Sequence, residues 1–232
     1  MMLKPNAAPS SEHNNPPRRS PSAAKLLAPP ILIAMGLWML LVSLFVHELG
    51  HVLGALATDG RVVSLELRPG RLGHTLVNPN PSPEVVLWSG LLFGWVAPFA
   101  TWPAWRLQRG LIGPTLRATT WFSWLALGSY LAVGGGERWS DTGQLMSAGW
   151  SALLLVALGS VVAMIGYAGS RHAWSILNER LETLANSPDA APHGVARLAA
   201  GWWTWLVLWW VLQHAAGGAI GSALGLGIAA EP

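Results

Sequence analysis

Residues 26–57 read LLAPPILIAMGLWMLLVSLFVHELGHVLGALA. A helix needs about 20 apolar residues to cross a bilayer, and this apolar segment is longer than that. Its ionisable groups are His47, Glu48 and His51. A carboxyl group inside such a span costs about 2.5–3.5 kcal/mol on insertion scales, and groups retained there usually face a polar interior and serve a function. The segment therefore predicts a membrane-spanning helix that carries a functional site.

The spacing of the three groups is that of an HExxH motif. On a helix, His47 and His51 are four residues apart, so both imidazoles lie on one face and can bind the same ion. Glu48 lies beside them, where it can take a proton from a water whose pKa zinc lowers to about 7. We predict a Zn²⁺ site with Glu48 as the base; the alternative is a buried polar cluster that only packs.

The composition is that of a membrane protein. Of the 232 residues, 52% are hydrophobic and only 11% are charged, whereas soluble domains average about 25% charged residues. The net charge is +3, but the basic residues are scattered, so we expect no nucleic-acid partner; the lipid bilayer is the expected anionic surface. Cysteine is absent, which excludes disulfides and thiolate ligands.

We predict an all-α integral membrane fold with about five transmembrane helices and a short β-hairpin after the first. Residues 1–27 are rich in Pro, Ser and Asn and are predicted to be a disordered basic tail. Residues 28–232 are predicted to form one polytopic membrane domain. Its expected spans are 29–57, 85–107, 118–133, 144–168 and 198–225, the last rich in tryptophan of the kind found in interfacial belts.

The segments between the spans are more polar. Residues 61–68 partly alternate, Pro69-Gly70 is a turn signal and residues 72–77 return, so a hairpin is predicted. It is either a connector or an edge onto which an extended substrate adds as a strand. Residues 169–197 are predicted to be a solvated surface element with one short helix.

The distribution of basic residues favours a cytoplasmic amino terminus. That orientation leaves only Arg61, Arg68, Arg71 and Arg138 outside, so ten of the fourteen Lys and Arg residues lie inside.

A catalytic zinc site usually has three protein ligands, so two histidines need a third partner. We predict Asp141, which opens a later span and is followed by Gly143, where backbone can approach closely. Capping of a helix by Ser140 or Asp141 is the ordinary alternative reading. Other candidates for the third ligand are Glu137, His214 and His74, although His74 is expected to be a surface histidine.

These motifs together resemble the intramembrane zinc metalloproteases of the site-2 protease family, especially their short bacterial members. The resemblance covers residues 43–159: HELGH in the first apolar segment, a hairpin-like segment, a small-residue helix with Gly90 and Gly94, and Asp-x-Gly before a later span. It implies a metalloprotease-like domain in which His47, His51 and Asp141 hold zinc and Glu48 activates water.

The chain departs from the family pattern at several points. Residues 89–94 (SGLLFG) lack the family's proline and asparagine, and residues 138–143 (RWSDTG) replace its Asn-Pro and Leu-Asp-Gly. No PDZ-like insertion is present. The arginine distribution also places the loop after HELGH outside, whereas relatives have it on the cytosolic side.

We therefore expect a zinc metalloendopeptidase, a multi-pass protein of the bacterial cell membrane, which cleaves transmembrane or membrane-adjacent segments of a membrane protein substrate. Two alternatives remain: a non-proteolytic membrane protein that binds or transports metal, and a catalytically inactive protease homologue.

Overall fold

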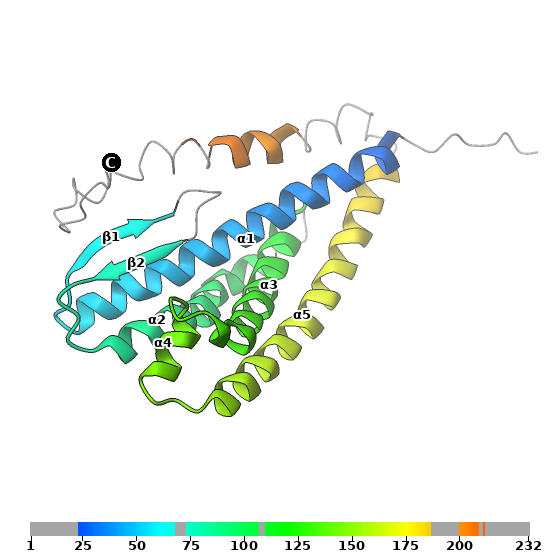
Figure 1. The fold of residues 1–232 in the computed structure, drawn as a ribbon. Coiled ribbons are helices and arrows are strands. Elements are labelled where there is room, and N and C mark those ends of the chain that lie inside the picture. Colours follow the sequence, from blue (N-terminus) through cyan, green and yellow to red (C-terminus); the bar gives the residue numbers. More distant parts are fainter. Residues whose placement is uncertain (1–22, 68–72, 107–109, 187–199, 209–210, 212–232) are drawn as a thin grey trace, which may run out of the picture.

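The computed structural model describes residues 23–67, 73–106, 110–186, 200–208 and 211. The fold is mostly helical with one small antiparallel sheet (Figure 1), as the sequence predicted. Its elements, in chain order, are α1 (Ala23–Ala57), β1 (Val62–Glu66), β2 (His74–Val77), α2 (Pro83–Val96), the 3-10 segment η1 (Ala97–Arg106), α3 (Ile112–Val133), η2 (Gly134–Gly136), α4 (Asp141–Ser147) and α5 (Ala152–Asn186). Residues 200–208 are also helical.

Within the described residues, three helices are long and apolar enough to cross a membrane: Pro29–Ala57, Pro83–Arg106 and Ala152–Thr183. The chain is thus a membrane protein by the length and composition of its helices. The first two match predicted spans. The predicted span 118–133 is part of α3, which is not among the three, and span 198–225 falls mostly outside the described residues, so the count of five is not confirmed.

The predicted boundaries of the fourth span, 144–168, are wrong. The chain instead forms the short helix α4, turns, and begins α5 at Ala152. Gly149 lies in this turn with φ at +101°, a left-handed conformation that glycine adopts without steric cost and that ends a helix.

The prediction that residues 169–197 form a solvated surface element with one short helix is also wrong as far as Asn186, because α5 continues without a break to that residue. The reason is a stripe of apolar side chains at helical spacing that packs on the amino-terminal half of α1. The buried members of this cluster are Ile31, Met35, Met39, Leu111, Ala118, Ala173, Leu177 and Leu181.

Helix α1 begins earlier than predicted. It starts at Ala23, so the predicted disordered tail, 1–27, loses its last five residues to the helix. Residues 23–28 read AAKLLA, all strong helix formers, and they extend the helix upstream of Pro29 and Pro30. Residues 1–22 lie outside the described part of the chain.

The predicted hairpin is present. Strands β1 and β2 are antiparallel, with Val62 opposite Val77 and Glu66 opposite His74. The hairpin lies along the carboxy-terminal part of α1 (Figure 1), where Val62 is buried with Val52 of α1 and Val86 of α2.

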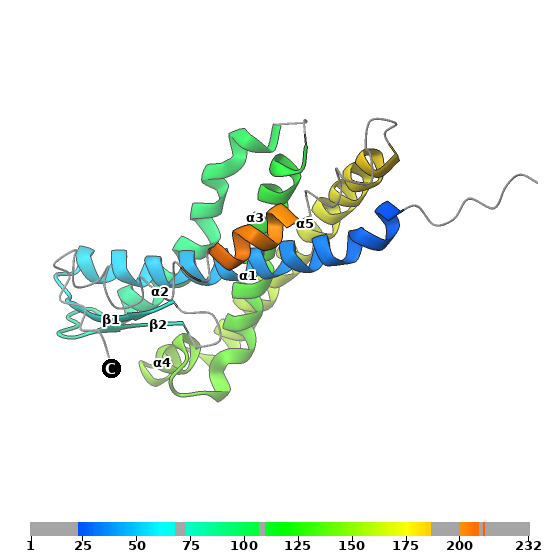
Figure 2. The ribbon, with the colours of Figure 1, turned by 90° about the horizontal axis from the view of Figure 1, so that it is seen from above.

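Glycines allow the helices to approach closely. Gly50 and Gly54 of α1 face Ser89 of α2, and Gly128 of α3 faces α5 at Gly159 and Ala163. Figure 2 shows the resulting arrangement from a second direction, with α4 near the hairpin and the carboxy-terminal part of α1. One buried cluster joins α4 to α2, α3 and α5: Leu87, Leu91, Trp95, Leu127, Leu131, Leu145, Leu155 and Val162.

The contact between α3 and α5 should not tolerate a side chain at Gly159. A Cβ there would lie 2.5 Å from the Ala132 backbone nitrogen and 2.7 Å from the Gly128 carbonyl oxygen. We expect Gly159→Val to lower the free energy of unfolding by about 1–3 kcal/mol. Gly36→Val is the matched control, since no atom lies within 4 Å of a Cβ at Gly36. Equal unfolding midpoints of the two variants in detergent would contradict this packing.

Candidate metal centre

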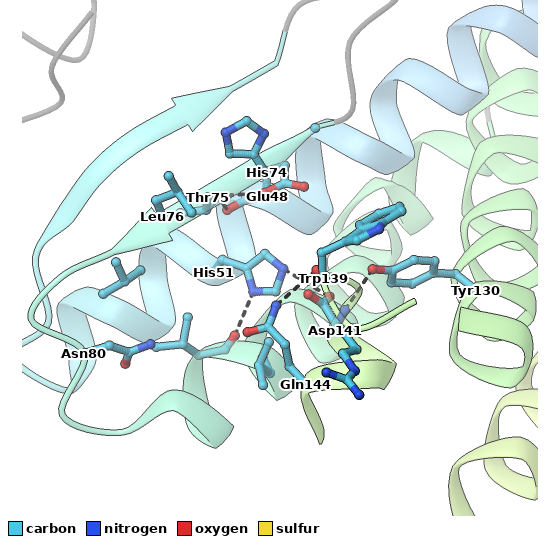
Figure 3. A pocket seen from close by; sticks show the side chains of 15 residues that line it. Glu48, His51, His74, Thr75, Leu76, Asn80, Tyr130, Trp139, Asp141 and Gln144 are labelled. Carbon is cyan, nitrogen blue, oxygen red and sulfur yellow. Dashed lines mark hydrogen bonds and ion pairs between the residues drawn. The ribbon is translucent and has the colours of Figure 1, made fainter. Parts of the chain in front are cut away.

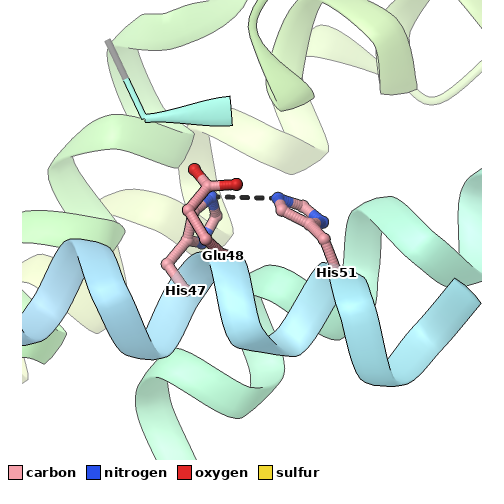
Figure 4. A group of neighbouring side chains, drawn as sticks. All are labelled: His47, Glu48 and His51. Atoms are coloured by element: carbon pink, nitrogen blue, oxygen red, sulfur yellow. Dashed lines mark hydrogen bonds between the residues drawn. The ribbon is translucent and has the colours of Figure 1, made fainter. Parts of the chain in front are cut away.

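His47 and His51 lie on one face of α1, as their spacing predicted. His47 and His51 are each 5% exposed, and their Nε2 atoms are 3.1 Å apart (Figure 4). The rings meet edge to face, with their centroids 4.6 Å apart. His47, Glu48 and His51 form a buried group that can hold a metal ion, because one ligand atom from each lies within 4.8 Å of the others.

The backbone of α2 sets the orientation and the tautomer of His51. Its Nδ1 is 2.8 Å from the carbonyl oxygen of Val86. A carbonyl oxygen only accepts hydrogen bonds, so Nδ1 carries the proton and donates it to Val86. In the neutral ring Nε2 then bears the lone pair, and this lone pair faces the centre of the site.

Gly90 makes room for this imidazole. The nearest atoms to a Cβ built on Gly90 belong to the His51 ring, with Nδ1 at 2.7 Å and Nε2 at 2.6 Å. The small residue that the sequence marked as a helix contact therefore also serves the metal centre.

Asp141 is brought to the two histidines across about ninety positions of the chain. One of its oxygens, Oδ2, is 3.0 Å from His47 Nε2 and 3.2 Å from His51 Nε2, and the residue is 8% exposed. Burial raises the pKa of this carboxyl group, but hydrogen bonds and charge from the two imidazoles outweigh burial and hold the pKa well below its usual value. Asp141 is therefore a carboxylate.

The start of α4 leaves this carboxylate free to face the histidines. The ordinary alternative, a helix cap, is filled by Ser140, whose hydroxyl accepts a hydrogen bond from the Gly143 backbone N–H at 3.0 Å. Gly143 is needed because a Cβ there would run into the carbonyl of Glu137. The cap and the candidate ligand are thus two neighbouring residues.

The three atoms form a small triangle. Its edges are 3.0, 3.1 and 3.2 Å, and its corners are two imidazole nitrogens and one carboxylate oxygen. Lone pairs held this close repel one another unless a cation lies among them. Either protons or a metal ion can supply that positive charge.

Glu48 is held beside the triangle by the hairpin. It is 3% exposed, and the hydroxyl of Thr75 on β2 donates a hydrogen bond to its Oε2 at 2.7 Å. A Cβ at Gly73 would lie 3.2 Å from its Oε1, so the hairpin backbone passes close to this carboxylate. The carboxylate thus stays near the imidazoles while its main contact is with the strand.

A cavity of about 490 Å³ opens next to these groups. Figure 3 shows β2 on one side of it and the residues around the start of α4 on the other. Glu48, His51, Tyr130 and Asp141 line it together with all four residues of β2. A molecule in this cavity can therefore reach Glu48, His51 and Asp141 at once.

The other candidates for the third ligand are less well placed. Glu137 and His74 are exposed, whereas Asp141 is buried. His214 lies outside the described part of the chain. Of the residues weighed from sequence, Asp141 is the one that meets both histidines.

Three groups at the candidate site were not predicted from the sequence: Thr75, Tyr130 and the carbonyl of Val86. Thr75 belongs to the strand predicted at 72–77, but nothing local shows that its hydroxyl meets Glu48. Tyr130 is one of only two tyrosines in the chain and lies in an otherwise apolar helix, which is a weak signal. The Val86 carbonyl could not be predicted, because every residue has a backbone carbonyl whatever its side chain.

Comparison of the chain with protein-family models, with curated proteins and with solved structures finds no match.

Replacement of Asp141 tests the triangle directly. Loss of a residue that only supports a metal ligand lowers metal affinity by about 10–100-fold. We expect Asp141→Asn to lower metal affinity by more than this, because the substitution removes a charged ligand. Metal bound per purified protein, measured by elemental analysis, is the readout. Glu137→Gln is the matched control and should leave it unchanged; loss of metal in this variant alone would assign the third ligand to Glu137.

Gly90→Ala tests how α2 supports His51. The added methyl group occupies the space of the imidazole, so we expect the ring to move and metal affinity to fall about 10-fold or more, the scale of an orientation effect. Gly36→Ala serves as the control, since a Cβ at Gly36 meets open space. Unchanged metal content in Gly90→Ala would show that His51 binds in another rotamer.

Proposed function

We propose that the protein is an intramembrane zinc-dependent endopeptidase that cleaves transmembrane or membrane-adjacent protein segments. The observation that carries the proposal is the triangle of His47, His51 and Asp141 with a fourth buried group, Glu48, held beside it. This is the donor set of a catalytic zinc site together with a separate carboxylate base.

The donor set fits zinc in chemistry and in size. Two imidazoles and one carboxylate suit this ion, and a catalytic site keeps three protein ligands with one open position. Two atoms each about 2.0–2.1 Å from one tetrahedral ion lie about 3.3–3.4 Å apart, close to the edges of 3.0–3.2 Å observed here. When bound there, zinc would acidify a water molecule and polarise the substrate carbonyl.

Glu48 is placed to move the proton. Peptide hydrolysis consumes one water: a C–O bond forms, the C–N bond breaks, and the leaving amine gains a proton. In our proposal Glu48 takes a proton from the water and returns it to the amine nitrogen. The Thr75 hydrogen bond occupies one lone pair of Oε2 and fixes the rotamer, so the carboxylate faces the cavity in a defined position.

The hairpin supplies a docking edge for the substrate. Successive side chains of a strand point to opposite faces, yet His74, Thr75, Leu76 and Val77 all line the cavity, so it follows the edge of β2 rather than one face. Within the described residues, β2 pairs only with β1. An extended segment of a membrane protein can therefore add as a further strand beside Glu48.

Hydrolysis, rather than metal storage or transport, requires that Glu48 act as a base and not as a ligand. Thr75 on the strand holds Oε2 of Glu48, which supports the role of base, although a Glu48 oxygen also lies close enough to the two imidazoles to bind the same ion. A multi-pass protein of the bacterial cell membrane, acting on a membrane protein substrate within the bilayer, fits this arrangement.

The decisive variant is Glu48→Gln, which keeps the shape and removes the base. We expect it to retain bound metal and to lose at least about 10²–10⁴-fold in the rate of cleavage of a reporter transmembrane segment reconstituted with the purified protein. Glu179→Gln, at an exposed position on α5, is the matched control.

Cleavage by Glu48→Gln at the wild-type rate would remove Glu48 from the mechanism. Metal-loaded wild-type protein that cleaves no reporter segment would instead favour a metal-binding protein or an inactive homologue.

A further inference from the structure

Tyr130 brings a phenol to the edge of the metal centre. It belongs to α3, lines the same cavity as Glu48 and Asp141, and its hydroxyl points toward Asp141 (Figure 3). Its ring packs edge-on against the His47 ring, with the centroids 5.8 Å apart. Tyr130 therefore contacts one candidate metal ligand and adjoins a second.

The hydroxyl oxygen of Tyr130 acts as an acceptor in the structure. The backbone N–H of Asp141 donates a hydrogen bond to it at 3.0 Å. A phenol has one proton to donate in addition to its lone pairs, and no acceptor for this proton is found among the described residues. Because the amide occupies one side of the oxygen, the O–H bond points elsewhere, and the cavity is the space that Tyr130 lines.

Two other donors that line the cavity already hold a hydrogen bond. The hydroxyl of Thr75 donates to Glu48, and the side-chain amide of Gln144 donates to the carbonyl of Trp139 at 3.1 Å. Thr75 would have to break its hydrogen bond before it could donate to a substrate, whereas Tyr130 would not.

We propose that Tyr130 donates a hydrogen bond to the carbonyl oxygen of the peptide bond under attack; this inference rests on the proposed hydrolytic function. Negative charge develops on that oxygen as water adds to the carbonyl carbon, and a donor fixed in advance stabilises this charge without reorganisation. The proton stays on Tyr130 throughout, so its part is a hydrogen bond and no covalent step.

The contact with the Asp141 amide strengthens this role. An N–H that donates to the phenol oxygen polarises the O–H bond and makes it a better donor. The same contact fixes the phenol relative to Asp141, so donor and metal ligands form one rigid unit. Loss of one such preorganised donor typically costs about 10²–10³-fold in kcat.

The test compares Tyr130→Phe with Tyr167→Phe, the equivalent change at the chain's other tyrosine, which is 59% exposed on α5. Each purified full-length variant is assayed for bound metal, thermal unfolding, and kcat and KM on the reporter segment. We expect Tyr130→Phe to keep its metal and its unfolding midpoint, to lose about 10²–10³-fold in kcat, and to change KM little, since the interaction forms only in the transition state. Tyr167→Phe should match wild type.

Each other outcome overturns the donor role. A wild-type kcat in Tyr130→Phe would show that the phenol proton is not used. A variant that loses its metal would show that Tyr130 only positions Asp141 through the amide contact. Failure of wild type and Tyr167→Phe to cleave would refute the proposed function itself. Loss of cleavage in Glu48→Gln together with a wild-type kcat in Tyr130→Phe would refute the donor role alone.

Discussion

The contact of one Asp141 oxygen with two imidazoles is the interaction on which the site depends. His47 and His51 are neighbours by helix geometry, but they become a three-donor centre only when α4 delivers a carboxylate to them. That delivery relies on the Ser140 cap, which orients the first turn of α4, and on Leu145, which anchors α4 in the core shared with α2, α3 and α5. A centre of this kind is therefore a property of the bundle and not of one helix.

Two backbone carbonyls inside the apolar bundle find partners on a neighbouring helix. At Ala97, α2 changes into the 3-10 segment η1, and the hydrogen bonding of the nearby backbone carbonyls changes with it. Side chains of α3 donate hydrogen bonds to these carbonyls. Ser123 donates to the carbonyl of Gly94 and Thr120 to that of Pro98. Irregular backbone at membrane depth is tolerated when neighbouring helices satisfy it in this way. The hydroxyl groups that make these hydrogen bonds make α3 more polar than a lipid-facing span. For this reason α3 is long enough to cross a membrane but is not among the three candidate spans.

The hairpin connects the surface that a substrate would use with the group that would perform the chemistry. Thr75 lies on the strand that borders the cavity and also holds the Glu48 carboxylate. Tyr130 approaches from the opposite side, beside Asp141. A peptide carbonyl between them would have a base on the side of β2 and a hydrogen-bond donor on the side of α3. Hydrolysis uses both groups, since the base takes a proton from water and the donor stabilises the carbonyl oxygen.

The sequence by itself determined the local features: the apolar length of the first helix, the shared face of His47 and His51, and the hairpin that follows. These depend on spacings of two to four residues, which backbone geometry translates directly into space. It also ranked Asp141 first among the candidates for the third ligand, from residue type and the glycine that follows. The tertiary structure decided that Asp141 meets both rings, that Thr75 holds Glu48, and that α5 runs on to Asn186 against α1. Those contacts join residues about 27 to 150 positions apart, and which partner a side chain meets over such separations is set by the packing of whole helices.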